Sequence, residues 1–233
     1  MTYLYQTFLV NPLFNILIFL YNNLFDFGIS IIILTILVRI LIYPLSKKSL
    51  ETQKNISLIQ PKIKEIQEKF KNNREEQTKA LMEFYKANKI NPFGGFLLLL
   101  IQLPIFLALF SVLSSSFGSD QFNGLYFFIE KPAVLNYLFL GMIDLAKPSL
   151  VLAVLVGITQ FLQLKMMTGL QSEKTDQVKK TDDFAADLNK KMVYFFPPLA
   201  TIITMSLSGG LALYWIVSNL FSIFQQEILF KKK

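Results

Sequence analysis

Long apolar runs alternate with polar segments along this chain. Five runs approach the roughly 20 residues that a helix needs to cross a bilayer, and they cover residues 27–46, 92–113, 149–167, 192–207 and 210–230. Hydrocarbon offers no hydrogen-bond partners, so a single segment crosses it as a helix that satisfies its own backbone. The pattern therefore predicts an all-α polytopic membrane protein with five transmembrane helices.

The first 26 residues have a different pattern. They contain no Lys or Arg, which excludes a signal peptide because that needs a positively charged start. Their apolar run, 13–21, is short for a span, and Asn11, Asn15 and Asn22 fall on one helical face. We expect residues 1–26 to form an amphipathic helix in the outer interface of the membrane, with a frayed apolar leader as the alternative.

Residues 47–91 form the longest polar segment, with eleven basic residues and six Glu. Pro61 can open a helix at its first turn, and Asn72 with Asn73 is typical of a turn. The segment predicts a cytoplasmic hairpin of two amphipathic helices. Its charges form a solvated face or dock on anionic lipid or a partner. The apolar positions of the two helices are Ile63, Ile66, Phe70, Leu81 and Phe84.

The other polar segments indicate the orientation. Asn91 followed by Pro92 is typical of a helix start, so the chain returns outward there to an outer loop at 114–148. A polar cytoplasmic loop follows at 168–191, and residues 231–233 are a basic tail. The two cytoplasmic segments and the tail hold nineteen of the 23 basic residues. Because basic residues concentrate on the cytoplasmic side, the N-terminus is predicted outside and the C-terminus inside.

Composition excludes several classes of function. The chain is 53% hydrophobic and 17% charged, and it has no Cys and no His. Disulfides, thiol chemistry and a zinc or redox-metal site are therefore not expected, and no phosphate-binding GxxxxGK[ST] motif occurs. The net charge of +7 follows the membrane orientation, so no specific nucleic-acid binding is predicted. We expect no cofactor and no catalytic residues.

The first span carries an arginine, Arg39, which costs about 2.5–3.5 kcal/mol at the centre of a span in insertion experiments. Thr35 lies one turn away on the same helical face. Arg39 either extends to the headgroups of the cytoplasmic side or faces a hydrated cavity. No span has an Asp or Glu at mid-depth, so the charge has no buried counter-ion in the sequence.

The other spans also carry polar residues, and two interpretations stay open for them. Each residue can hydrogen-bond helix to helix, or all can line one water-filled groove that opens to the cytoplasm. Polar residues at mid-depth in every span favour the groove. Its candidate lining residues are Arg39, Thr35, Gln102, Gln160, Gln163, Trp215 and Ser218.

Several long motifs resemble the YidC/Oxa/Alb3 family of membrane protein insertases. They are LTILVRILIYPLSKKS in the first span, IQPKIKEIQEKF in the hairpin, NPFGGFLLLLIQLPIFLALF, FLGMIDLAKPS and GGLALYWIVSNLFSIFQQ. The resemblance extends from about residue 10 to residue 226. The motifs include no counterpart of the extra first span and outer domain that some bacterial members carry. They also include no counterpart of the lipoprotein cysteine of other members.

The resemblance implies a non-enzymatic insertase of the bacterial inner membrane, with five helices around a groove open to the cytoplasm. It implies groove roles for Arg39, Gln102, Gln160 and Trp215, and nascent membrane proteins with short or acidic tails as clients. Insertion would need no nucleotide. A monomer is plausible, and association with the Sec translocon or the ribosome is left open. Apolar client segments would slide along Phe106, Leu109, Phe195, Phe196 and Leu199.

Two other classes of function remain as alternatives. A small-solute channel or transporter needs polar residues through both halves of the membrane, but 29–34, 110–113 and 150–155 are nearly all apolar. A purely structural scaffold leaves Arg39 unexplained.

Overall fold

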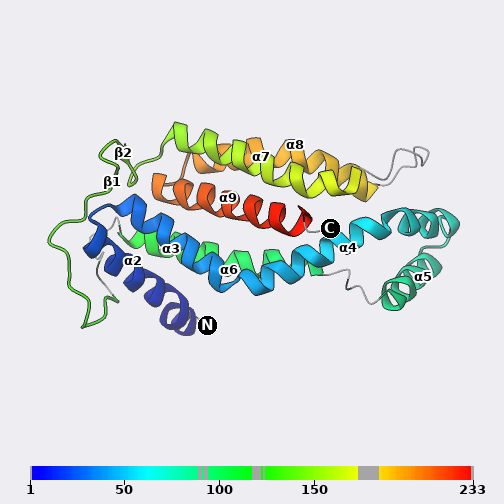
Figure 1. Cartoon of the computed structure of the whole chain (residues 1–233), viewed down its shortest axis with the longest axis horizontal. Helices are drawn as coiled ribbons and strands as arrows, with labels where there is room; N and C mark the ends of the chain where they lie inside the picture. The colour runs from blue at the N-terminus through cyan, green and yellow to red at the C-terminus, as the bar shows by residue number, and fades with distance from the viewer. Residues whose placement is uncertain are drawn as a thin grey trace.

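The computed structural model describes residues 2–88, 91, 94–116, 122, 124–172 and 184–231, and these form long helices with one short β-hairpin (Figure 1). The predicted helix start at Pro92, residues 173–183 of the cytoplasmic loop, part of the outer loop and the end of the tail lie outside the described residues. The helices are α1 (Thr2–Tyr5), η1 (Gln6–Val10), α2 (Asn11–Leu24), α3 (Phe27–Leu41), α4 (Tyr43–Lys69), α5 (Arg74–Ala87), α6 (Gly94–Ser116), α7 (Leu150–Ser172), α8 (Phe184–Thr204) and α9 (Gly209–Lys231).

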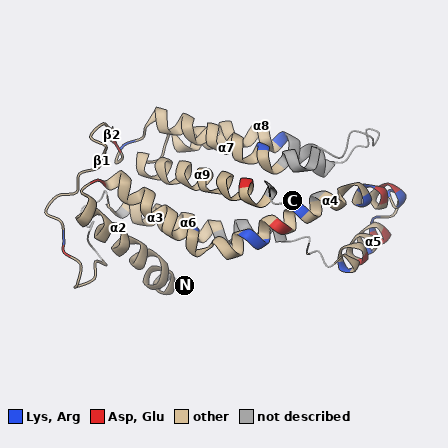
Figure 2. Ribbon diagram, in the orientation of Figure 1, with Lys and Arg blue, Asp and Glu red and all other residues tan. Residues whose placement is uncertain are grey.

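The helices run roughly along one long axis, and the two ends of the molecule differ. Strands β1 (Leu138–Phe139) and β2 (Ile143–Asp144) pair antiparallel at one end. The α4–α5 hairpin projects from the other end, and most of the coloured charges lie there (Figure 2). Helices α3, α7 and α9 all begin at the β-hairpin end and run side by side toward the α4–α5 end (Figure 1). The structure therefore separates charged from apolar segments along its length, as the sequence predicts.

Helix α3 begins where the side chain of Asp26 accepts a hydrogen bond from the backbone N–H of Ile29 at 2.9 Å, as an N-cap does. It ends at Leu41, and α4 continues from Tyr43 at an angle of 64°. Pro44 stands in the first turn of α4, where a proline loses no intrahelical hydrogen bond. The straight helix α3 is therefore shorter than the transmembrane helix expected over residues 27–46.

Helix α4 differs from the prediction that a new helix opens at Pro61, because it runs through that residue without a break. The proline removes one backbone donor, which this helix accommodates. The second hairpin helix, α5, is capped by Asn73, and Gln77 Nε2 donates to the Gln67 carbonyl of α4 at 2.7 Å. Of the five predicted apolar positions of the hairpin, Ile63 is buried and Ile66, Phe70, Leu81 and Phe84 are half-buried.

The N-terminal helices are joined to the outer loop by asparagine side chains. Asn15 Nδ2 donates to the Gly124 carbonyl at 2.8 Å, and its Oδ1 accepts from the Tyr126 N–H at 2.7 Å. Asn22 Nδ2 donates to the Glu130 carbonyl at 2.7 Å. The asparagine face predicted for an interfacial helix therefore faces a loop of the protein.

By length and hydropathy, two helical stretches of the described residues can cross a membrane: Tyr3–Leu24 and Leu150–Met167. The bent pair Phe27–Leu41 and Tyr43–Ile56 is a third if it counts as one span. The stretch Tyr3–Leu24 is longer than the apolar run 13–21 on which the interfacial helix was predicted. Its length therefore does not exclude a membrane span. Helix α9 falls short because it carries polar residues such as Asn219 and Gln225, which the structure buries.

Candidate functional site: a polar interior between α3, α7 and α9

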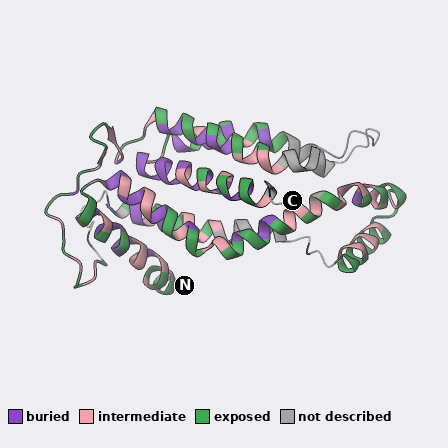
Figure 3. Ribbon diagram, in the orientation of Figure 1, coloured by how far each residue is buried: buried purple, intermediate pink, exposed green. Residues whose placement is uncertain are grey.

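The interior changes from apolar to polar at the same level on three parallel helices. On α3 the last buried apolar residue is Leu34 and the first polar residue beyond it is Thr35. On α7 the change comes at Thr159, and on α9 at Ser218. These positions are eight or nine residues from the helix starts at Phe27, Leu150 and Gly209, a rise of about 12 Å. Apart from Ser30, the buried side chains of α3, α7 and α9 in the half toward the β-hairpin are apolar, and the other half holds a cluster of buried polar ones. Figure 3 shows the buried positions along these helices.

Arg39 lies in the polar half, on α3, with 8% of its surface exposed. Its guanidinium donates to the hydroxyl of Ser218 on α9. Neither of the two ion pairs found between described residues includes Arg39. The side chain is therefore turned toward α9, which argues against a snorkelling arginine, and a neutral hydroxyl orients it. A charge buried in this way keeps a strong demand for an anionic or polar partner.

Tyr214 joins Gln102 to this site, although the sequence did not single it out. It is buried on α9 one turn before Ser218, and its hydroxyl accepts a hydrogen bond from Gln102 Nε2 at 2.8 Å. The ring of Phe106 lies 6.3 Å from the Tyr214 ring. The spacing of four residues between Tyr214 and Ser218, which puts both on one helical face, is the signal that could have found Tyr214.

Trp215 and two glutamines form the opposite side of the cluster. Trp215 Nε1 donates to Gln160 Oε1 at 3.0 Å, and Gln160 Nε2 donates to Gln163 Oε1 at 3.3 Å. Phe106 supports the indole edge-on, with 5.7 Å between ring centroids. The structure thus brings together the predicted residues Gln160, Gln163 and Trp215.

The polar cluster continues along α9 toward the α4–α5 end. Asn219 Nδ2 donates to Thr159 Oγ1 at 3.1 Å, and Gln225 Nε2 donates to Ser46 Oγ at 2.9 Å. Gln226 is 1% exposed, and its Oε1 has no donor among the described residues. A buried acceptor without a partner is costly, so this part of the interior has capacity for a further hydrogen bond.

Thr35 makes a local contact: its Oγ1 donates to the Ile31 carbonyl of its own helix at 2.6 Å. The five predicted client-contact residues are divided between two environments. Leu109 is 2% exposed in the apolar core, whereas Phe195 is 69% exposed on α8. Phe106 and Phe196 are half-buried, and Leu199 is exposed.

No group of residues that could hold a metal ion occurs among the described residues. The predicted site instead consists of one arginine, amides, hydroxyls and aromatic rings within a bundle whose outer surface exposes many large apolar side chains. Exposed apolar surface of this extent is typical of contact with lipid or another protein. The fold and the site define an integral membrane protein that keeps a polar interior.

Comparison with known proteins identifies the family. The chain matches the family described as 60Kd inner membrane protein over residues 19–233. The membrane protein insertase YidC of Wigglesworthia glossinidia brevipalpis is 37% identical over 224 residues, 96% of this chain and 37% of that protein. The membrane protein insertase YidC of Geobacter metallireducens is 33% identical over 223 residues, again 96% of this chain and 37% of that protein.

A solved structure described as active YidC insertase, with the first transmembrane domain resolved, shares the fold with a TM-score of 0.59 at 24% identity. The match covers 94% of this chain and 45% of that one. The chain belongs to the 60Kd inner membrane protein family, which confirms the resemblance seen in the motifs. It spans little more than a third of the length of the relatives it matches. Their name describes insertion rather than a covalent reaction, as expected for a protein that is not an enzyme.

Proposed function

We propose that this chain is an insertase that moves short client tails and transmembrane segments from the cytoplasm into the bilayer. The observation that carries the proposal is the change from an apolar to a polar interior at one level of α3, α7 and α9. Water and a polar polypeptide segment can enter such an interior from one side only. The relatives named membrane protein insertase support the same activity.

In this mechanism Arg39 is the group that attracts the client. Its charge pairs with an acidic residue of the client tail, and the hydroxyl of Ser218 holds the guanidinium in place between clients. The amides of Gln102, Gln160 and Gln163 offer polar contacts to the client backbone, so the desolvation of the tail is only partial. Arg39 then lowers the energy of a charged tail inside the membrane.

The apolar part of the client follows a different route. Phe195 and Leu199 on α8 are exposed to the surroundings of the bundle, so they offer an apolar surface leading from the polar interior to lipid. Burial of each client methylene in hydrocarbon stabilises the inserted state by about 0.8 kcal/mol. Transfer of the client helix into lipid supplies the driving force, and no nucleotide is consumed.

The proposed arrangement has five spans, with the N-terminus outside and the C-terminus in the cytoplasm. The concentration of Lys and Arg at the α4–α5 end (Figure 2) supports this orientation. The clients are nascent membrane proteins with short or acidic tails. The bundle encloses its own site, which supports a functional monomer, and Sec or ribosome association is a further part of the proposal.

Water access distinguishes this function from its main rival, a small-solute channel. The chain has no cysteine, so single cysteines can replace Thr35, Gln102, Gln160 or Ser218 and be labelled with a membrane-impermeant thiol reagent. Val112, buried in the apolar core, is the matched control position. Labelling from the cytoplasmic side alone supports the insertase. Labelling from both sides indicates a channel, and no labelling from either side overturns the proposal.

A further inference from the structure

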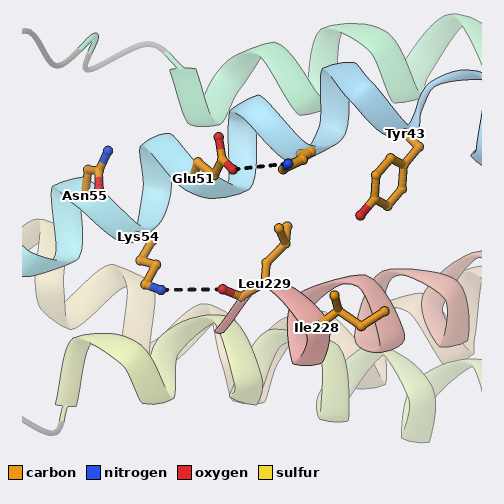
Figure 4. A pocket seen from close by; sticks show the side chains of 7 residues that line it. Tyr43, Glu51, Lys54, Asn55, Ile228 and Leu229 are labelled. Carbon is orange, nitrogen blue, oxygen red and sulfur yellow. Dashed lines mark hydrogen bonds and ion pairs between the residues drawn. The ribbon is translucent and has the colours of Figure 1, made fainter. Parts of the chain in front are cut away.

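A second polar site lies where α4 passes the last turns of α9 (Figure 4). It is a cavity of about 390 Å³, within the range of small-molecule sites. Helix α4 lines it with Lys47, Glu51, Lys54 and Asn55, and α9 lines it with Ile228 and Leu229. None of these residues belongs to the cluster around Arg39, so the cavity is a separate site.

The charged residues of this cavity share one face of α4, because they are spaced by four and three positions. Lys47 Nζ lies 3.8 Å from Glu51 Oε1, and these side chains are 47% and 51% exposed. Lys54 Nζ donates to the Leu229 carbonyl at 3.4 Å, which places a cation at the C-terminal end of α9. The exposed Lys47–Glu51 ion pair is weak, so a phosphate can compete with Glu51 for Lys47.

The cavity stands at the boundary of two apolar segments. Tyr43, which also lines it, is the first residue of α4 after the apolar helix α3. Ile228 and Leu229 lie in the last turn of α9, just before the basic end of the chain. In an inner membrane protein, the ends of apolar helices lie at the level of the lipid headgroups.

We propose that this cavity binds the headgroup of a phospholipid that carries both a phosphate and a primary ammonium, as phosphatidylethanolamine does. Lys47 and Lys54 bind the phosphate, and Glu51 accepts hydrogen bonds from the ammonium. Tyr43, Ile228 and Leu229 contact the glycerol and the start of the acyl chains. Glu51 between two lysines disfavours a purely anionic headgroup, because it repels the negative charge that the lysines attract.

The test uses the full chain in nanodiscs with equal amounts of phosphatidylethanolamine, phosphatidylglycerol and phosphatidylcholine, and native mass spectrometry of the lipids that stay bound. We expect phosphatidylethanolamine to be retained at least fivefold over each of the others. The choline group has no N–H to donate to Glu51. Lys47→Ala with Lys54→Ala should abolish the retention, and Glu51→Gln should make phosphatidylglycerol equal to phosphatidylethanolamine. Lys62→Ala and Glu65→Gln, exposed on α4 beyond the cavity, are the controls and should change nothing.

Equal retention of the three lipids overturns the proposal, and so does unchanged retention in the double lysine variant. Displacement of the lipid by an acidic peptide, but not by glycerophosphoethanolamine, would assign the cavity to a protein segment instead. If the double variant does not fold, Lys47→Gln alone gives the same comparison. Its replaced side chain is half-exposed, so folding should be retained.

Discussion

Arg39 on α3 donates a hydrogen bond to Ser218 on α9, although 179 positions separate them in the sequence. This contact sets the orientation of Arg39, the one charged side chain that the described part of the chain buries. It also joins two helices at the level where the buried side chains change from apolar to polar. The proposed insertase depends on that orientation, and the following predictions test the parts that produce it.

Ser218→Ala should weaken both folding and insertion. The substitution leaves the buried guanidinium without its hydroxyl partner, so we expect a loss of about 1–3 kcal/mol in the free energy of unfolding. We also expect insertion of an acidic-tailed client to slow several-fold. Unfolding in detergent and insertion into proteoliposomes measure the two effects. Ser222→Ala is the matched control, because the Ser222 hydroxyl donates only to the Ser218 carbonyl of its own helix. Equal losses in both variants would contradict the role given to Ser218.

Gln160→Leu should change the fluorescence of Trp215, the one tryptophan of the chain. The indole N–H loses its acceptor at 3.0 Å, and the site becomes more apolar. We expect a blue shift of the emission and weaker quenching by acrylamide. Leu162→Ala, on the exposed surface of α7, is the control and should leave the spectrum unchanged. An unaltered spectrum in Gln160→Leu would show that the indole does not rely on this glutamine.

Gly209→Ala should destabilise the end of the bundle that lies away from the polar interior. A Cβ at this position would lie 3.1 Å from the Lys147 carbonyl oxygen and 3.2 Å from Leu145 Cα. Both are backbone atoms, and the Gly209 N–H already donates to the Lys147 carbonyl at 2.9 Å. We expect a loss of about 1–3 kcal/mol in the free energy of unfolding, measured by thermal unfolding. Ser206→Ala, at an exposed position in the turn before Gly209, should cost little. A harmless Gly209→Ala would refute the close approach.

The sequence predicted the helical class, the hairpin and most of the polar cluster because each depends on local patterns. Apolar runs and charged loops identify the helices and their ends, and spacing of three or four residues places Trp215 and Ser218 on one face of α9. The motifs identified the family. These patterns place residues on a helix and on one of its faces, although the helix start predicted at Pro61 was wrong.

The partners of each residue depend on contacts between distant segments, which the sequence did not reveal. Tyr214 looked like one more aromatic residue of a span, yet it is the partner of Gln102. Asn15 looked like part of a water-facing stripe, yet it bonds the outer loop. Pro61 looked like a helix start, but the long helix α4 includes it. Leu109 was assigned to a client surface by the family resemblance, and it packs in the core.

The charge of Arg39 is the feature on which the proposed mechanism depends, and exchanging charges tests it. A single-span client with a short outward tail would carry one Asp, Asn or Lys in that tail. Its insertion into proteoliposomes would be measured by protease protection. The wild-type chain and Arg39→Lys should insert the Asp tail best, Arg39→Ala should lose that preference, and Arg39→Glu should prefer the Lys tail. If all four chains insert the three tails in the same order, Arg39 does not recognise the client and the mechanism is wrong.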